Sequence, residues 1–235
     1  MTNDKLIVSE IFYSIQGEGP NAGKPAVFLR LAGCNLKCEW CDTKYAITST
    51  RTSAITSYSA EQILKKIKSY PCKHLVITGG EPLLQQDGLI ELLKKLKGYY
   101  VEIETNGSIP LKANLSYRAK SRRSRAIVTK PRYEQINCSP KLKNSKNCPY
   151  SLKISPKNDK VIYKFVAQNK RDLKDIRQYI LDNGIPRHKV YLMPEGVNKK
   201  IVQERSKWII EACKKENYNF SPRLHVMLWG NKRGV

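Results

Sequence analysis

Three cysteines fall within eleven residues in the stretch GCNLKCEWCDT, residues 33–43. Cys34, Cys38 and Cys41 are close enough along the chain to act together as metal ligands or as a redox centre. The chain has seven cysteines, an odd number, and the other four have no spacing that would indicate a disulfide scaffold: Cys72, Cys138, Cys148 and Cys213. We therefore expect a reducing, cytoplasmic environment for this chain.

The number of clustered thiolates restricts the kind of site. A structural zinc ion needs four protein ligands, and no further cysteine or histidine pair lies nearby to complete the set. A catalytic zinc with three thiolates is an alternative, although such sites usually include histidine. A redox pair would use only Cys38 and Cys41 and leaves Cys34 unexplained. A cubane 4Fe–4S cluster normally takes four thiolates, so three would leave one iron open to a substrate or cofactor.

The elements that must position these cysteines form an alternating pattern. An apolar segment typical of a buried strand, AVFLRLA (26–32), leads directly into them. Further strands are predicted at 74–78, 100–105, 135–139, 161–168, 189–193 and 223–229. Helices are predicted at 60–68 after an N-cap at Ser59, at 88–97, at 171–183 before Gly184, and at 199–216. This alternation predicts an α/β fold with a parallel sheet and right-handed crossovers.

Polar segments follow five of the predicted strands. They are the cysteine stretch, GGEP at 79–82, NG at 106–107, SPK at 139–141 and PEG at 194–196. Because the carboxyl ends of parallel strands meet at one edge of a sheet, these segments are expected to share a single rim. The sequence therefore predicts an active site at the C-terminal rim of the strands.

The net positive charge of the chain is unusually high. The 43 Lys and Arg residues against 20 Asp and Glu residues give a formal net charge of +23, and residues 111–160 alone contain 14 basic and 2 acidic residues. One interpretation is a nucleic-acid footprint, and the other is a solvated loop in a generally lysine-rich chain. The run has little aromatic interleaving for base stacking, which favours the loop. No apolar run reaches the roughly 18 residues of a membrane span, and no signal peptide is expected at the start.

The spacing Cys34-x3-Cys38-x2-Cys41, with Trp40 before the last cysteine, resembles the signature of radical S-adenosylmethionine enzymes. GGEP at 79–82 resembles the segment by which that superfamily holds the methionine amino group. The resemblance implies a partial (β/α) barrel with its site at the C-terminal rim, and a 4Fe–4S cluster whose open iron binds S-adenosylmethionine. In that superfamily an electron from the cluster releases a 5′-deoxyadenosyl radical. Glu81 is then expected to accept a bond from the methionine ammonium.

Several longer segments resemble the 7-carboxy-7-deazaguanine synthase (QueE) family. They are residues 10–43, TGGEPLLQ (78–85), IETNGS (103–108), NCSPK (137–141) and LHVMLWGNKRGV (224–235). The resemblance implies a carbon–nitrogen lyase that rearranges 6-carboxy-5,6,7,8-tetrahydropterin into 7-carboxy-7-deazaguanine with loss of ammonia, in queuosine-type biosynthesis. It also implies an electron donor such as flavodoxin and a homodimer. The whole chain, 1–235, would be one domain with a basic insertion near 112–133 and a lysine-rich linker near 142–160.

The same resemblance assigns residues to the pterin substrate and to the metals. The substrate residues would be Ile15, Gln16, Gly17, Glu18, Arg30, Thr78, Glu104, His225 and Val235. Arg30 would pair with the substrate carboxylate through its planar fork, and Val235 would contribute its terminal carboxylate. The cluster ligands would be Cys34, Cys38 and Cys41, and Thr43 would be the single protein ligand to Mg²⁺. Structural roles are the alternative for three of these residues: a surface charge for Arg30, backbone bonding for Glu104 and core packing for His225.

S-adenosylmethionine would contact a second set: Trp40, Gly80, Glu81, Ser139, Pro140, Lys141, Leu192, Met193, Pro194 and Glu195.

Two other functions are alternatives to the synthase. A radical-activase of the ribonucleotide-reductase type shares the cysteine motif, but it would explain neither QGEG (16–19) nor the NKRGV segment (231–235). A basic nucleic-acid-binding protein with a structural iron–sulfur cluster is the other, and salt-dependent tRNA binding without S-adenosylmethionine cleavage would favour it.

Overall fold

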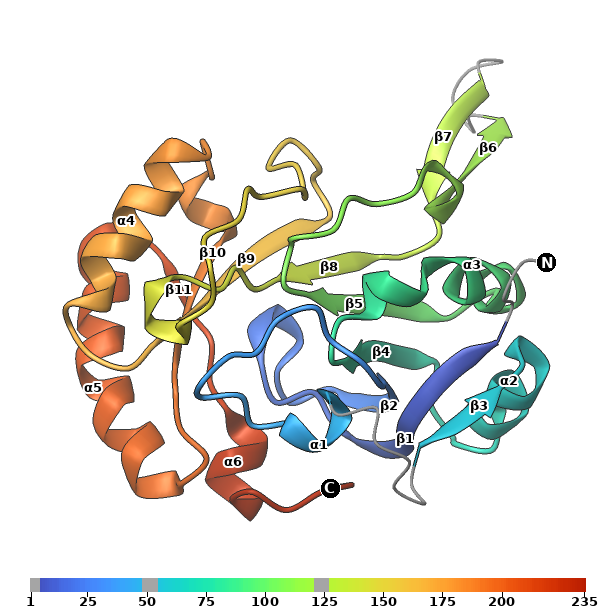
Figure 1. Cartoon of the computed structure of the whole chain (residues 1–235), viewed down its shortest axis with the longest axis horizontal. Coiled ribbons are helices and arrows are strands. Elements are labelled where there is room, and N and C mark those ends of the chain that lie inside the picture. The colour runs from blue at the N-terminus through green and yellow to red at the C-terminus, as the bar shows by residue number, and fades with distance from the viewer. Residues whose placement is uncertain (1–4, 48–54, 121–126) are drawn as a thin grey trace.

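A curved, nine-stranded mixed sheet forms the centre of the molecule (Figure 1). The computed structural model describes residues 5–47, 55–120 and 127–235. The strand order is β11-β10-β9-β8-β5-β4-β2-β1-β3. The strands are β1 (Leu6–Ile15), β2 (Pro25–Leu31), β3 (Thr56–Tyr58), β4 (His74–Gly79), β5 (Tyr100–Thr105), β8 (Gln135–Cys138), β9 (Val161–Ala167), β10 (Val190–Pro194) and β11 (Asn219–Phe220).

The seven strands from β2 to β11 run parallel, as the alternating pattern predicts. β1 is antiparallel to both β2 and β3, so the sheet as a whole is mixed and not purely parallel. In the described residues no ladder joins β3 to β11, which leaves the barrel open. The predicted partial (β/α) barrel is confirmed.

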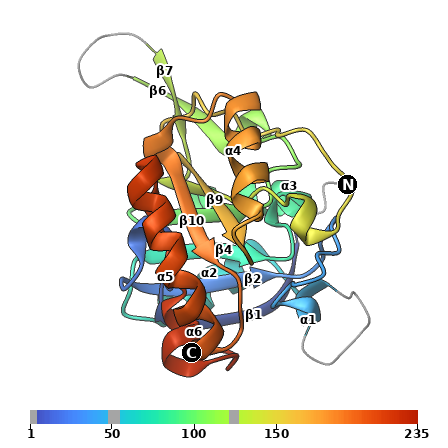
Figure 2. The ribbon, with the colours of Figure 1, turned by 90° about the vertical axis from the view of Figure 1, so that its left-hand side faces the viewer.

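Helices cover the outer face of this sheet (Figures 1 and 2). They are α2 (Ala60–Lys68), α3 (Gln86–Lys95), α4 (Asp172–Asp182) and α5 (Lys199–Glu216). Two short helices, α1 (Lys44–Ile47) and α6 (Leu224–Trp229), instead carry Tyr45 and His225 toward the inner side of the sheet. Short 3-10 helices lie at Gly19–Asn21, Pro82–Gln85, Ala113–Leu115, Lys143–Ser145 and Arg187–Lys189. Ser59 caps α2 as predicted: its Oγ accepts from Gln62 N, and Gln62 Oε1 accepts from Ser59 N at 2.8 Å. Within the described residues, no helix has both the length and the hydropathy needed to cross a membrane.

Strand alternation separates the core from the site. On β5, Val101 and Ile103 point to the outer side and join the buried apolar core beneath the helices. Glu102 and Glu104, the residues between and after them, point to the inner side of the curved sheet. The same alternation on β2 buries Leu29 in the core and places Arg30 on the inner side. Polar residues within apolar strands therefore gather on the concave face.

The predicted strand at 223–229 is wrong, because residues 224–229 form helix α6. The chain does pair briefly with β10 through β11, and Ser221 N still donates to Leu192 O at 2.8 Å. Pro222 then has no N–H to continue the ladder, so the chain leaves the sheet. In α6 Val226 is buried, whereas Leu228 and Trp229 are exposed, which fits a helix at the edge of the fold.

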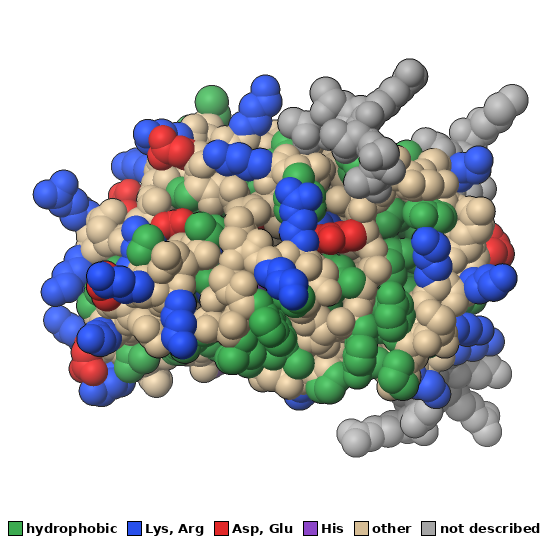
Figure 3. Space-filling view, turned by 90° about the horizontal axis from the view of Figure 1, so that it is seen from below, with side chains coloured by type: hydrophobic (Ala, Val, Ile, Leu, Met, Phe, Trp, Pro, Cys, Tyr) green, Lys and Arg blue, Asp and Glu red, His purple; other side chains and the backbone are tan. Residues whose placement is uncertain are grey.

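The basic stretch, interpreted above as a solvated loop, contains an antiparallel hairpin of β6 (Ser116–Lys120) and β7 (Ile127–Pro131). The hairpin projects from the upper right of the body in Figure 1. Residues 121–126, the densest part of the basic run, lie outside the described residues. On the face seen in Figure 3, Lys and Arg side chains are scattered over the surface, and apolar side chains gather near its centre and right.

Candidate active site

A cavity lies at the carboxyl ends of the parallel strands. Each of the five polar segments that follow predicted strands contributes at least one lining residue, including Cys34, Gly80, Asn106, Ser139 and Glu195. These residues are far apart along the chain and come together only because parallel strands end at the same edge. The structure therefore places the five segments around one cavity.

The three clustered cysteines line one side of this cavity. Leu36 N lies 3.4 Å from Cys34 Sγ, and Thr43 Oγ1 lies 3.6 Å from Cys41 Sγ. In the described part of the chain, no three Cys, His, Asp or Glu side chains converge as one metal ion would require. A cubane cluster suits this arrangement better than zinc, because each thiolate binds a different iron. Burial raises the pKa of the Cys34 thiol, so a cationic centre is needed to hold it as a thiolate.

The GGEP segment packs directly against the backbone that precedes the cysteines. Gly80 N donates to Leu31 O at 3.1 Å, and Glu81 N donates to Gly33 O at 2.8 Å. A Cβ on Gly80 would lie 2.0 Å from Gly33 O, and Gly79 has a φ of +134°. Glycine is required at both positions because no side chain fits between the two backbones. The cysteine loop and the GGEP segment therefore form one rigid unit.

Four residues expected to contact S-adenosylmethionine do not line the cavity: Glu81, Pro140, Leu192 and Pro194. The Glu81 carboxylate is fully buried and accepts from Leu83 N, Thr105 Oγ1 and Asn106 N at 2.9, 2.8 and 2.7 Å. These bonds close the GGEP turn, so the carboxylate does not face the cavity as expected for an ammonium contact. Leu192 faces the core because strand alternation on β10 turns Met193, and not its neighbours, toward the cavity.

A buried charge network also lines the cavity and reaches the cysteine loop at Asp42. Lys164 of β9 and Arg223, just before α6, both pair with the Glu18 carboxylate, and Arg223 also pairs with Asp42. Burial acts to raise the pKa of Glu18, but the two cations outweigh it and hold that pKa well below its ordinary value. Burial lowers the pKa of His225, whose Nε2 lies 3.9 Å from Glu18 Oε1. The two cations therefore keep Glu18 ionised at pH 7, and burial keeps His225 neutral.

Glu104 and Arg30 have side-chain partners on the inner face of the sheet. Glu104 Oε2 accepts from Thr78 Oγ1 at 2.8 Å, and Gln16 Nε2 lies 3.4 Å from Glu104 Oε1. These contacts are to side chains and not to the backbone of a turn. Arg30 Nε donates to Glu10 Oε1 at 2.6 Å, and its guanidinium lines the cavity. Neither residue is an isolated surface charge.

Residues 230–235 also line the cavity, including Val235. The guanidinium of Arg233 lies 3.5 Å from the centre of the Tyr45 ring, and Tyr45 Oη donates to Glu10 Oε1 at 2.8 Å. Burial and the neighbouring Glu10 raise the pKa of Tyr45 to about 12, so its hydroxyl stays protonated. Arg233 therefore attaches this segment to the same Glu10 that holds Arg30.

Glu102 organises the floor of the site and was not predicted from the sequence. Its carboxylate is fully buried and accepts bonds from Gln16 Nε2 at 3.0 Å, His74 Nε2 at 2.8 Å, Asn137 Nδ2 at 3.0 Å, and Asn21 Nδ2. Burial acts to raise the pKa of Glu102, but these donors, His74 first, lower it. Gln16 and Asn137 line the cavity, so Glu102 orients two polar groups that a ligand would meet.

Glu102→Gln is expected to destabilise the fold by about 1.5–3 kcal/mol, because an amide NH₂ would face donors that need a charged acceptor. Denaturant unfolding measures this loss. The matched control is Glu134→Gln, because Glu134 is exposed and accepts only from Val101 N at 2.9 Å among its described bonds. That control should stay within about 0.5 kcal/mol of the wild type. Equal stability of the two variants would show that Glu102 does not organise the site.

An open α/β barrel with three cysteines at its C-terminal rim defines a radical S-adenosylmethionine enzyme. The model of the radical SAM superfamily matches residues 29–119. Over 234 residues the chain is 38% identical to the 7-carboxy-7-deazaguanine synthase of Pyrobaculum aerophilum, covering 98% of this chain and 97% of that one. It is 36% identical to the synthase of Hyperthermus butylicus, covering 96% and 94% of the two chains.

The chain belongs to the 7-carboxy-7-deazaguanine synthase family. The crystal structure of QueE from Escherichia coli shares its fold, with a TM-score of 0.68, 24% identity, and coverage of 95% of this chain and 96% of that one. The family's cofactors are a 4Fe–4S cluster and S-adenosylmethionine. The expected enzyme class, a radical S-adenosylmethionine lyase, is confirmed.

Proposed function

We propose that the protein contracts the ring of 6-carboxy-5,6,7,8-tetrahydropterin to give 7-carboxy-7-deazaguanine, with loss of ammonia. The observation that carries the proposal is the division of one cavity into two sides. Three cysteines and Gly80 line one side, and Gln16 and Glu104 line the other, on the sheet's inner face. A cofactor and a polar heterocycle can therefore occupy adjacent positions.

The residues of each side suit the group that we assign to it. When bound, the cluster and S-adenosylmethionine supply the radical chemistry. Trp40, Gly80, Ser139, Lys141, Met193 and Glu195 line the cofactor side. Gln16 and Glu104 can bind the donors and acceptors of an amino-pyrimidinone ring. Glu10 accepts from the Nε of Arg30, so the terminal nitrogens of that guanidinium can form a bidentate pair with the substrate carboxylate.

The decisive experiment is anaerobic incubation of the reconstituted protein with the carboxy-tetrahydropterin, S-adenosylmethionine and Mg²⁺. Mass analysis should find the deazaguanine product and 5′-deoxyadenosine in matching amounts. Cleavage of S-adenosylmethionine without conversion of the pterin would overturn the substrate assignment. The competing radical-activase leaves the QGEG segment unexplained, and residues of that segment line the cavity.

Thr43 is the residue that we propose as the protein ligand to Mg²⁺. It lines the cavity beside Cys41, and Mg²⁺ commonly takes few protein ligands with the rest from water and substrate. Thr43→Ala should raise the Mg²⁺ concentration needed for half-maximal turnover, with iron content unchanged. Thr43→Ser keeps the hydroxyl and should behave like the wild type. An unaltered Mg²⁺ response in Thr43→Ala would remove this residue from the metal site.

We propose further that a flavodoxin-like protein reduces the enzyme, that the enzyme acts as a homodimer, and that it resides in the cytoplasm. The cytoplasmic assignment rests on its unpaired cysteines, since each described cysteine is free. Nucleic acid is not a proposed partner.

The chain is proposed to be one domain, 1–235. In it, the β6–β7 hairpin belongs to a basic insertion near 112–133, and the linker near 142–160 packs against the cysteine loop.

A further inference from the structure

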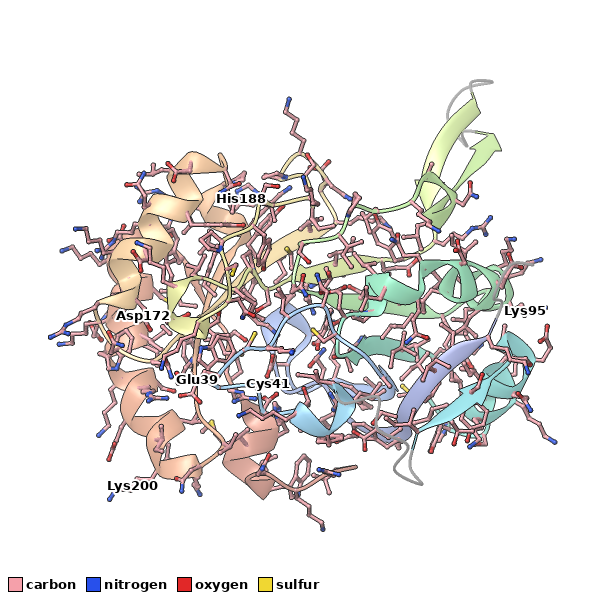
Figure 4. The ribbon with its side chains drawn as sticks, in the orientation of Figure 1. Glu39, Cys41, Lys95, Asp172, His188 and Lys200 are labelled. Atoms are coloured by element: carbon pink, nitrogen blue, oxygen red, sulfur yellow. The ribbon has the colours of Figure 1, made fainter. Side chains whose placement is uncertain are left out.

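A short turn from the lysine-rich linker packs against the loop that carries the cysteines. The turn consists of the 3-10 helix η4 (Lys143–Ser145), Lys146 with a left-handed φ of 58°, and Asn147. In Figure 4 it lies beside the loop on which Glu39 and Cys41 are labelled. The motifs that relate this chain to its family do not include the turn, so its function has to be derived from its contacts.

Two hydrogen bonds join the backbone of the turn to the cysteine loop. Glu39 N donates to Ser145 O at 3.0 Å, and Trp40 Nε1 donates to Asn144 O at 2.8 Å. A surface ion pair between Lys146 Nζ and Glu39 Oε1, at 2.5 Å, adds a third contact. The turn therefore contacts the loop at residues 39 and 40, which lie between Cys38 and Cys41.

Asn147 contacts a cysteine sulfur directly. Its Nδ2 lies 3.1 Å from Cys38 Sγ, and its Oδ1 accepts from Lys37 N at 2.9 Å. The second bond fixes the orientation of the amide, because only the oxygen can accept from a backbone N–H. The NH₂ group must then face the sulfur as a donor.

The turn is itself anchored to the barrel, so this donor is held in place. Asn144 Nδ2 donates to Val166 O at the end of β9 and to Asp172 Oδ2 at the start of α4, both at 3.0 Å. Ser145 is fully buried and its Oγ donates to Leu142 O at 2.6 Å. Asn147 is therefore positioned by the framework and is not a mobile surface amide.

We propose that Asn147 is a positioning residue for the cluster, which orients Cys38 and raises the reduction potential by donating to its sulfur. Hydrogen bonds to the sulfurs of an iron–sulfur cluster help to set its potential, and a donor favours the more electron-rich reduced form. The proposal rests on the assignment of the cluster to Cys34, Cys38 and Cys41. Asn147 thereby acts on the electron-transfer step through a ligand and does not touch the substrate.

The test compares three variants of the reconstituted protein at pH 8. Asn147→Ala removes every side-chain bond of this residue, including the bond from Nδ2 to Ser145 Oγ at 3.0 Å. Asn147→Asp keeps the acceptor for Lys37 N, removes the donor to sulfur and adds a negative charge, which acts on the potential in the same direction. Lys146→Gln is the matched control, because it removes the adjacent surface ion pair with Glu39 and leaves the sulfur contact intact. Iron and sulfide content, and the midpoint potential from a redox titration followed by electron paramagnetic resonance, are measured for each protein.

Both Asn147 variants should show a more negative midpoint potential than the wild type, and Asn147→Asp should keep its full iron content. Lys146→Gln should match the wild type in midpoint potential and in iron content. Wild-type potentials in loaded Asn147→Asp would overturn the proposal. So would failure of both Asn147 variants to hold a cluster that Lys146→Gln still holds, since the residue would then only support the loop. A wild-type protein that bound no cluster would instead overturn the cofactor assignment.

Discussion

Replacement of Cys34, Cys38 or Cys41 by alanine is expected to abolish S-adenosylmethionine cleavage. The three thiols line one side of the cavity, and each is expected to bind a different iron of the cluster. A cluster with two protein ligands would be lost or unable to keep a defined open iron. The measurement is 5′-deoxyadenosine formed under anaerobic reduction, together with iron and sulfide per chain.

The controls for this prediction are two cysteines outside the cavity. Cys148 is exposed and Cys213 is buried in the core, where its Sγ lies 3.4 Å from Asn219 O. Cys148→Ala should leave iron content and cleavage unchanged, and Cys213→Ala should lower stability without changing the chemistry of folded protein. Normal cleavage by any one of the three cluster variants would contradict the assignment.

Local patterns in the sequence were sufficient to predict most of the framework. Helix α5 has the predicted bounds, 199–216, and α2 begins after the predicted cap at Ser59. Apolar runs identify parallel strands because both faces of such strands are covered. The LHVMLW segment was assigned wrongly because a short apolar run fits a strand or a helix equally well. This segment does not continue the sheet because Pro222, just before it, ends the ladder with β10.

The buried charge network of the cavity could not be predicted in the same way. Glu18 and Lys164 are 146 residues apart, and Arg223 is 205 residues from Glu18, so no local pattern links them. A weak signal does exist in the strands themselves. Glu102 in YVEIET and Lys164 in VIYKFVA are charged residues with apolar neighbours on both sides in a strand, where an unpaired buried charge would be costly. Such residues require partners, but the sequence does not identify them.

The buried pair of Lys164 and Glu18 yields the second large expected effect. Lys164→Met is expected to lower the free energy of unfolding by about 3–5 kcal/mol, because removal of one partner leaves a buried charge less compensated. Ring contraction should fall by about 100-fold, since Glu18 lines the cavity and a small displacement of a binding group has an effect of that size. Denaturant unfolding and anaerobic product assays measure the two losses.

A double-mutant cycle separates this pair from general damage to the core. Glu18→Gln removes the charge that Lys164 compensates, so the double variant should be more stable than the sum of the single losses predicts, by about 0.5–3 kcal/mol.

The pH dependence of stability provides a second check on this pair. The pKa of Glu18 is lowered in the fold, so its contribution is present at pH 7 and is lost as the pH falls through that lowered value. In Lys164→Met the pKa of Glu18 should rise, so this residue takes up a proton in mild acid that the wild-type residue does not. The stability difference between wild type and Lys164→Met should therefore shrink from pH 7 toward acid. Strictly additive losses, or a difference that does not change with pH, would show that Lys164 acts through packing and not through the Glu18 charge.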